Sequence, residues 1–203
     1  MNRASPSPVL EVPPPPATSG SRGRFWAARL VLFVACASVV ATSQATSPDV
    51  DSKELVGAPL SLTTEAPKAS RRLLIRASAP KPPSKRAEGE VSVRVTARWI
   101  PADPSQTVSP WLKVMLSEDA DSSGAVSSGI LTAGTPLTLE GSGYLSPDCE
   151  LKDSCEWSRH VNFEFQANAA AGTVELEWTA QAHVRVVDTS SVPDGFTVDI
   201  SAP

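Results

Sequence analysis

Hydrolytic chemistry is the first chemistry to test against the side chains of this 203-residue chain, which contains two histidines and 22 acidic residues. A nucleophilic serine needs a histidine and a carboxylate beside it, and many hydrolases carry that serine in a G-x-S-x-G turn. The sequence has no such turn, because Gly141-Ser142-Gly143 is an ordinary turn sequence. It also lacks a P-loop, a G-x-G-x-x-G and an H-E-x-x-H motif. We therefore predict no catalytic residues and no enzymatic activity.

Cation binding is a second chemistry, because Glu118, Asp119 and Asp121 lie in one loop, SEDADSSG. Carboxylates with nearby carbonyl groups are the ligands that calcium prefers. The loop lacks the glycine and the distal glutamate of an EF-hand. Exposed loops rich in Asp and Ser need no ion. Solvated side chains are therefore the favoured interpretation, with calcium as the alternative, and no cofactor is predicted.

The three cysteines fall into two groups. Five residues separate Cys149 from Cys155 and no second pair of ligands lies beside them, which is not the pattern of a zinc site. Cleavage of an export signal after Ala41 or Ala45 would remove Cys36 and leave these two cysteines. An even number of cysteines in an exported chain predicts a disulfide bond instead. Cys36 ends Phe33-Val34-Ala35-Cys36, which resembles a lipobox and makes lipidation an alternative to cleavage.

Aromatic side chains offer a third chemistry, the stacking of a sugar ring or the anchoring of a partner. Alternation places Trp99, Trp157 and Trp178 on the buried face of their strands. Trp111 falls on the face opposite its apolar neighbours, and Tyr144 lies in an expected loop. Trp111 and Tyr144 are therefore the candidate ligand-stacking residues.

The elements that must position these side chains are β-strands. Apolar and polar residues alternate over 91–99, 161–167 and 174–186, and shorter segments at 112–116, 130–131, 137–139 and 196–200 complete the pattern. Successive side chains of a strand point to opposite faces, so this pattern predicts sheets with one buried and one wet face. About seven strands in residues 88–203 predict an all-β, antiparallel, Ig-like sandwich.

A hairpin over residues 156–187 would pair Phe165 with Val174 and Val161 with Trp178. This register would bring Glu164, Glu175 and Glu177 together as an acidic strip on the wet face. It would also place His160 and His183 opposite Thr179 and Glu156, too far apart to share a metal. The strip is expected to be solvated, or neutralised by a cation or a basic segment.

Charge is distributed unevenly along the chain. Residues 88–203 carry 17 acidic and 6 basic residues, which argues against a nucleic-acid partner. Residues 68–86 carry seven basic residues and no acidic one. Together with the Pro- and Ser-rich composition, this predicts a disordered basic linker over residues 46–87. A short edge strand at 71–76, or folding of the basic stretch onto the acidic strip, is the alternative.

The first 45 residues resemble an export signal. Three arginines precede the apolar run from Leu30 to Ala41, and cleavage sites are expected after Ala41 or Ala45. The run is shorter than the roughly 20 residues of a spanning helix. Cleavage is favoured over a retained membrane anchor and over lipidation at Cys36.

These observations predict an exported, non-enzymatic β-sandwich that binds an unknown protein or glycan partner, or has a structural role, at the cell envelope or outside the cell. The alternatives are a carbohydrate- or calcium-binding accessory domain and a membrane-tethered lipoprotein. Membrane contact is expected only if Cys36 is lipidated or the signal is retained as an anchor.

Overall fold

The computed structural model describes residues 26–35, 46–119 and 124–203, and the chain divides into two units, Met1–Ser43 and Gln44–Pro203. In the first unit, residues 26–35 form a helix with exposed side chains. No helix in the described ranges is both long enough and apolar enough to span a bilayer. The second unit is all-β. Its strands are β1 (Val50–Asp51), β2 (Leu55–Val56), β3 (Leu60–Thr63), β4 (Lys68–Ser78), β5 (Lys85–Pro101), β6 (Trp111–Ser117), β7 (Ala125–Ile130), β8 (Leu137–Tyr144), β9 (Cys149–Leu151), β10 (Ser154–Gln166), β11 (Gly172–Val186) and β12 (Thr197–Ser201).

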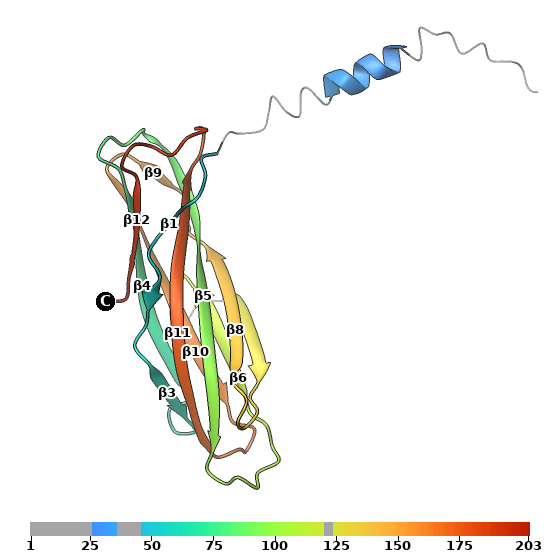
Figure 1. The fold of residues 1–203 in the computed structure, drawn as a ribbon, viewed down its shortest axis with the longest axis vertical. Helices are drawn as coiled ribbons and strands as arrows, with labels where there is room; N and C mark the ends of the chain where they lie inside the picture. The colour runs from blue at the N-terminus through green and yellow to red at the C-terminus, as the bar shows by residue number, and fades with distance from the viewer. Residues whose placement is uncertain (1–25, 36–45, 120–123) are drawn as a thin grey trace, which may run out of the picture. The chain divides into compact units, whose positions relative to one another are not determined.

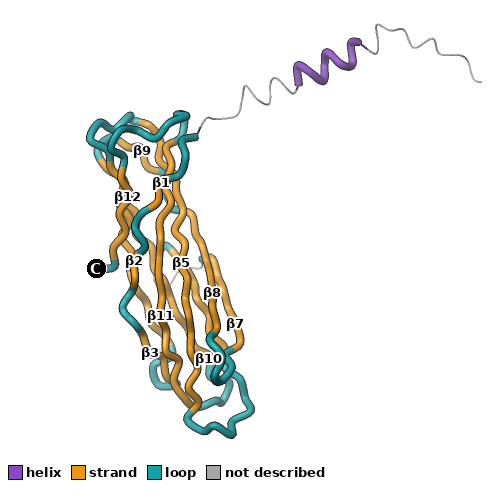
Figure 2. Tube along the Cα trace, viewed as in Figure 1, coloured by secondary structure: helices purple, strands orange, loops and turns teal. Residues whose placement is uncertain are grey.

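The strands form two antiparallel sheets (Figures 1 and 2). The first sheet has the order β1-β11-β5-β8, with β2 and β3 also paired to β11 and β9 paired to β5. The second sheet has the order β12-β4-β10-β6-β7. The predicted all-β, sandwich-like architecture is therefore confirmed, and the strands overlapping 88–203 number eight, close to the expected seven.

The core lies between the two sheets and contains the inward residues of the long strands. Trp99, Trp157 and Trp178 are buried, as their parity predicts. Aromatic rings of the two sheets meet in this core. The ring of Phe163 lies 6.0 Å from that of Trp178, and the ring of Phe165 lies 5.4 Å from that of Trp99. Tilted pairs at these distances stabilise the packing beyond simple burial of area.

The prediction of a disordered linker over residues 46–87 is wrong, because most of this segment forms strands of the sandwich. β4 pairs with β10 along its whole length and with β12, so it lies inside the second sheet. Leu73, Ile75 and Ala77 point into the core and are buried. Lys68, Arg72 and Arg76 alternate with these buried residues and point to the opposite face, where Lys68 pairs with Glu164 and Arg76 with Glu156. Most of the basic residues of β4 therefore lie on the wet side of the strand, whereas Arg71 is half-buried on the face of Leu73.

Residues 46–63, called here the strap, run along the free side of β11 and include β1, β2 and β3. The backbone N–H groups of Ser47, Ser52 and Gly57 donate to the carbonyls of residues 186, 182 and 178. Between one of these hydrogen bonds and the next, the strap advances by five residues and β11 by four. Each such interval of the strap therefore contains a bulge. Bulges hide the period of two, which explains why alternation did not reveal these strands.

The predicted hairpin of residues 156–187 is also wrong. β10 lies in the second sheet between β4 and β6, whereas β11 lies in the first sheet beside β5. The chain between them crosses from one sheet to the other. Alternation assigned the buried face of each strand correctly, but two strands with buried faces can meet across a core as well as within one sheet.

Candidate functional site

The candidate site lies on the outer, wet face of the first sheet. β11 and β5 pair over fifteen residues, and β8 pairs with the other side of β5. This register places outward side chains in rows that cross the strands. One row contains His183, Glu90 and Tyr144; the next contains Gln181, Ser92 and Ser142; and the third contains Thr179, Arg94 and Glu140.

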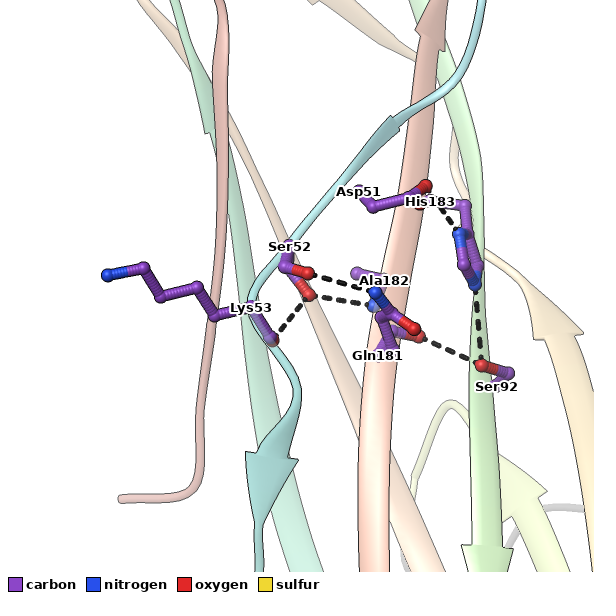
Figure 3. Close-up of polar contacts among 7 residues, drawn as sticks. All are labelled: Asp51, Ser52, Lys53, Ser92, Gln181, Ala182 and His183. Carbon is purple, nitrogen blue, oxygen red and sulfur yellow. Dashed lines mark hydrogen bonds and ion pairs between the residues drawn. The ribbon is translucent and has the colours of Figure 1, made fainter.

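The structure brings Asp51, His183 and Ser92 together on this face (Figure 3). Oδ1 of Asp51 lies 2.7 Å from Nδ1 of His183, and Nε2 of the same ring lies 3.4 Å from Oγ of Ser92. The three residues come from β1, β11 and β5, which are far apart in the sequence, so no local motif could predict that they meet. These are the residue types of a hydrolytic triad, although the sequence offered no sign of one.

The surroundings of Ser92 favour neither activation of its hydroxyl by His183 nor the binding of an oxyanion. Its hydroxyl lies 3.3 Å from the carbonyl of Gln181, an acceptor that competes with the histidine nitrogen at 3.4 Å. Ser92 also lies inside β5, with β11 on one side and β8 on the other, so the neighbouring backbone N–H groups are taken by the two ladders. An oxyanion hole needs free donors aimed at the reacting carbonyl. Within the described residues, this arrangement orients the His183 ring and connects β1 to β11.

The strap positions Asp51 by a repeated contact. Oγ of Ser47 accepts from the N–H of Val186 at 2.9 Å, and Oγ of Ser52 accepts from the N–H of Ala182 at 3.0 Å. Each serine hydroxyl donates to the carbonyl of the residue that follows it in the chain. Ser52 therefore fixes the backbone immediately after Asp51.

The sequence does carry a signal for the strap, which period-two analysis missed. Residues 46–60 read TSPDV-DSKEL-VGAPL, a repeat of five with Ser or Gly second and an aliphatic residue last. The aliphatic members, Val50, Leu55 and Leu60, pack against the core. At the third repeat, the indole of Trp178 occupies the space that a side chain at Gly57 would need.

Tyr144 ends β8 and is the most exposed aromatic residue of the sandwich, with 81% of its surface accessible. Its backbone is held from beneath by Arg159, whose side chain is only 5% exposed. Nε and Nη2 of Arg159 donate to the Tyr144 carbonyl at 3.2 and 2.7 Å. Burial lowers the pKa of this guanidinium, and the carboxylate of Glu118 opposes the shift. The tyrosine ring is thus presented to solvent on a fixed backbone.

The other predicted aromatic residue, Trp111, is not part of this face. It lies on β6 of the second sheet, half-buried, with Ile130 opposite it on β7. Trp111 and Tyr144 therefore cannot contact one ligand in the way that a single stacking platform would require.

The loop for which calcium is the alternative interpretation is described only in part, at Glu118, Asp119 and Gly124. Glu118 pairs with Arg159 at 3.5 Å, and the Ser117 hydroxyl donates to the carbonyl of Asp119. Asp121 lies outside the described residues, as does Cys36. In the described part of the chain, no group of three His, Cys, Asp or Glu residues is arranged to hold a metal.

The acidic strip is not formed, because its members are separated. Glu164 lies on the second sheet between Lys68 and Lys113, at 3.1 and 3.8 Å from their Nζ atoms. Glu175 and Glu177 lie on the first sheet, opposite Arg98 and Thr96. Similarly, His183 lies opposite Asp51 and Glu90, and His160 lies opposite Arg72 and Ser117. These are corrections that follow from the wrong hairpin.

The cysteine prediction is confirmed by distance. The sulfur atoms of Cys149 and Cys155 lie 2.07 Å apart, with Cα atoms at 5.8 Å. The bond connects β9 to the start of β10 and thus joins the edge of the first sheet to the second.

Comparison with known proteins does not assign the chain to a family. No family model matches the sequence, and no curated protein matches it. Among solved structures, a chain of the cryo-EM structure of Broad Bean Stain Virus aligns with 70% of this chain and 89% of its own length, at 11% identity. The TM-score of 0.30 is too low for that likeness to carry an argument.

Proposed function

We propose that this chain is an exported, non-enzymatic β-sandwich of the Ig-like class that binds a partner at the cell envelope or outside the cell. The observation that carries the proposal is the outer face of the first sheet, where the exposed Tyr144 stands beside a polar hollow. A large aromatic ring left in water beside such a hollow is a typical anchor for a partner.

Two further features support export. The basic and apolar pattern of residues 22–41 is typical of a signal sequence. The pair Cys149–Cys155 is at bonding distance, and such bonds persist in oxidising compartments.

A non-enzymatic role is supported by the surroundings of Ser92. Its hydroxyl is directed to competing acceptors, and the described backbone around it offers no free donor for an oxyanion. A serine in this position contributes hydrogen bonding to the face and does not act as a nucleophile.

The first test is the intact mass of the protein recovered from its producing cells, before and after reduction. We expect a chain that begins after Ala41 or Ala45 and gains two hydrogens on reduction. A mass beginning at Cys36 with acyl chains would favour the lipoprotein alternative. Full-length protein confined to the cytoplasm with free thiols would contradict the proposal.

A further inference from the structure

A trough crosses the strands of the first sheet on its outer face. Its floor is the row of Ser92, Ser142 and Gln181. The serine side chains are short, and the Gln181 amide donates to the carbonyl of Ser52 at 3.1 Å. The flanking rows carry larger side chains. The hollow above this floor has a volume of about 440 Å³, and a second of about 350 Å³ adjoins it around His183 and Tyr144.

The dimensions of the trough suit a short chain better than a single small molecule. The trough runs from the strap across β11 and β5 to β8. Four neighbouring strands at the usual spacing span about 14 Å. The two flanking rows are four residues apart along each strand, or about 13 Å from backbone to backbone.

The chemistry of the walls matches a sugar. Tyr144 offers a flat apolar ring, on which the C–H face of a pyranose can stack. On the opposite wall, Nε of Arg94 donates to Oε1 of Glu140 at 2.9 Å, which places a planar donor beside a planar acceptor. Sugar hydroxyls both donate and accept, so adjacent donors and acceptors can bind them together. The serine hydroxyls of the floor add groups with the same dual capacity.

The charge of the site selects among glycans. Glu54 and Glu140 line the trough with Arg94, and Glu90 and Asp51 lie in the row of His183 and Tyr144. Arg185, in the adjoining row, already pairs with Glu88. An anionic polymer would therefore meet a surplus of carboxylates, and like charges disfavour such a partner.

We propose that this trough binds a neutral glycan built of pyranose rings, laid across the strands with one ring stacked on Tyr144. This inference rests on the proposed binding function of the same face. It adds the ligand class, the direction of the bound chain, and the roles of Tyr144 as stacking platform and of Arg94 and Glu140 as hydroxyl ligands.

The test is affinity electrophoresis and calorimetry of the exported protein against soluble polymers. The neutral probes are β-1,3- and β-1,4-linked glucans, galactomannan and xylan, and the anionic probes are polygalacturonate and heparin. We expect binding to at least one neutral polymer. Binding confined to anionic polymers, or to none of the panel, would overturn the inference. Neither result would alter the intact mass, so the proposed function would remain separately testable.

Variants then locate the site. Tyr144→Ala should weaken neutral-glycan binding about tenfold or more, which corresponds to the loss of about 1.4 kcal/mol of stacking. Tyr144→Phe should retain most of the affinity, because it keeps the ring. The exposure of this side chain predicts an unchanged melting temperature for both variants.

A second pair of variants tests the opposite wall with a matched control. Arg94→Met removes the pair with Glu140, whereas Lys152→Met removes a similarly exposed pair with Glu150 outside the trough. We expect a loss of affinity in the first variant alone. Full affinity in both Tyr144→Ala and Arg94→Met would place the glycan elsewhere and overturn the inference.

Discussion

The strap makes a prediction that separates a folded strand from a linker: replacement of Ser52 by Ala should destabilise the whole sandwich. Ser52 is buried, and its Oγ accepts from the N–H of Ala182 at 3.0 Å while donating to the Lys53 carbonyl at 3.0 Å. Alanine leaves both backbone groups without this partner. The loss of a buried hydrogen-bond partner costs about 1–3 kcal/mol.

Ser47 makes the same two contacts five residues earlier in the strap. Its Oγ accepts from the N–H of Val186 and donates to the carbonyl of Pro48. The two serines are five strap residues apart and share no partner, so their effects should add. We therefore expect Ser47→Ala with Ser52→Ala to lower the free energy of unfolding by about 2–6 kcal/mol. The exposed Ser61 of the same strap is the matched control, and Ser61→Ala should stay within about 0.5 kcal/mol of the parent chain.

The assay is equilibrium unfolding in urea, followed by tryptophan fluorescence and by circular dichroism. Coincident transitions would justify a two-state analysis. A double variant as stable as the parent would refute the reasoning, because it would mean that residues 46–63 do not contribute to the folded domain in solution. An effect of similar size in Ser61→Ala would show that the loss is not specific to the buried contacts.

Three other predictions concern the core, the cysteines and the polar row. Gly57→Ala should lower the free energy of unfolding by about 1–3 kcal/mol, because its Cβ would overlap the indole of Trp178; urea unfolding measures this, and an unchanged midpoint would contradict the packing. Reduction of the Cys149–Cys155 bond should cost about 2 kcal/mol, since the loop that it closes is short; thermal unfolding with and without a reductant tests this, with the double Cys→Ser variant as the control. Ser92 should not react with a fluorophosphonate probe, and mass spectrometry detecting stoichiometric labelling that requires the Ser92 hydroxyl would show that the site has nucleophilic chemistry after all.

The residues of the candidate site were only partly predictable from the sequence. Tyr144 stood out as an aromatic residue outside the core pattern, and the structure shows it exposed. Its supposed companion, Trp111, had the same outward parity but belongs to the other sheet. Parity tells which face of its own strand a residue occupies, and carries no information about which strands lie beside it.

The strap shows a different reason for failure. Its Ser, Thr and Pro content is typical of linkers, and each bulge shifts the alternation by one residue. The stabilising contacts of Ser47 and Ser52 are made to residues more than 120 positions away. No local pattern can show that a serine hydroxyl will find such a partner.

The sequence by itself determined the all-β class, the inward tryptophans, the cysteine pair and most strand positions, because these depend on the alternation of side chains and on local spacing. Only the tertiary structure decided that β10 and β11 lie in different sheets, that basic residues of β4 neutralise Glu164 and Glu156, and that Asp51, His183 and Ser92 meet. The apolar face of one strand can be buried against that of almost any other, so hydrophobic burial alone does not select a strand order. The order depends on which combination of connections, bulges and charge pairs leaves every backbone N–H and carbonyl with a hydrogen-bond partner.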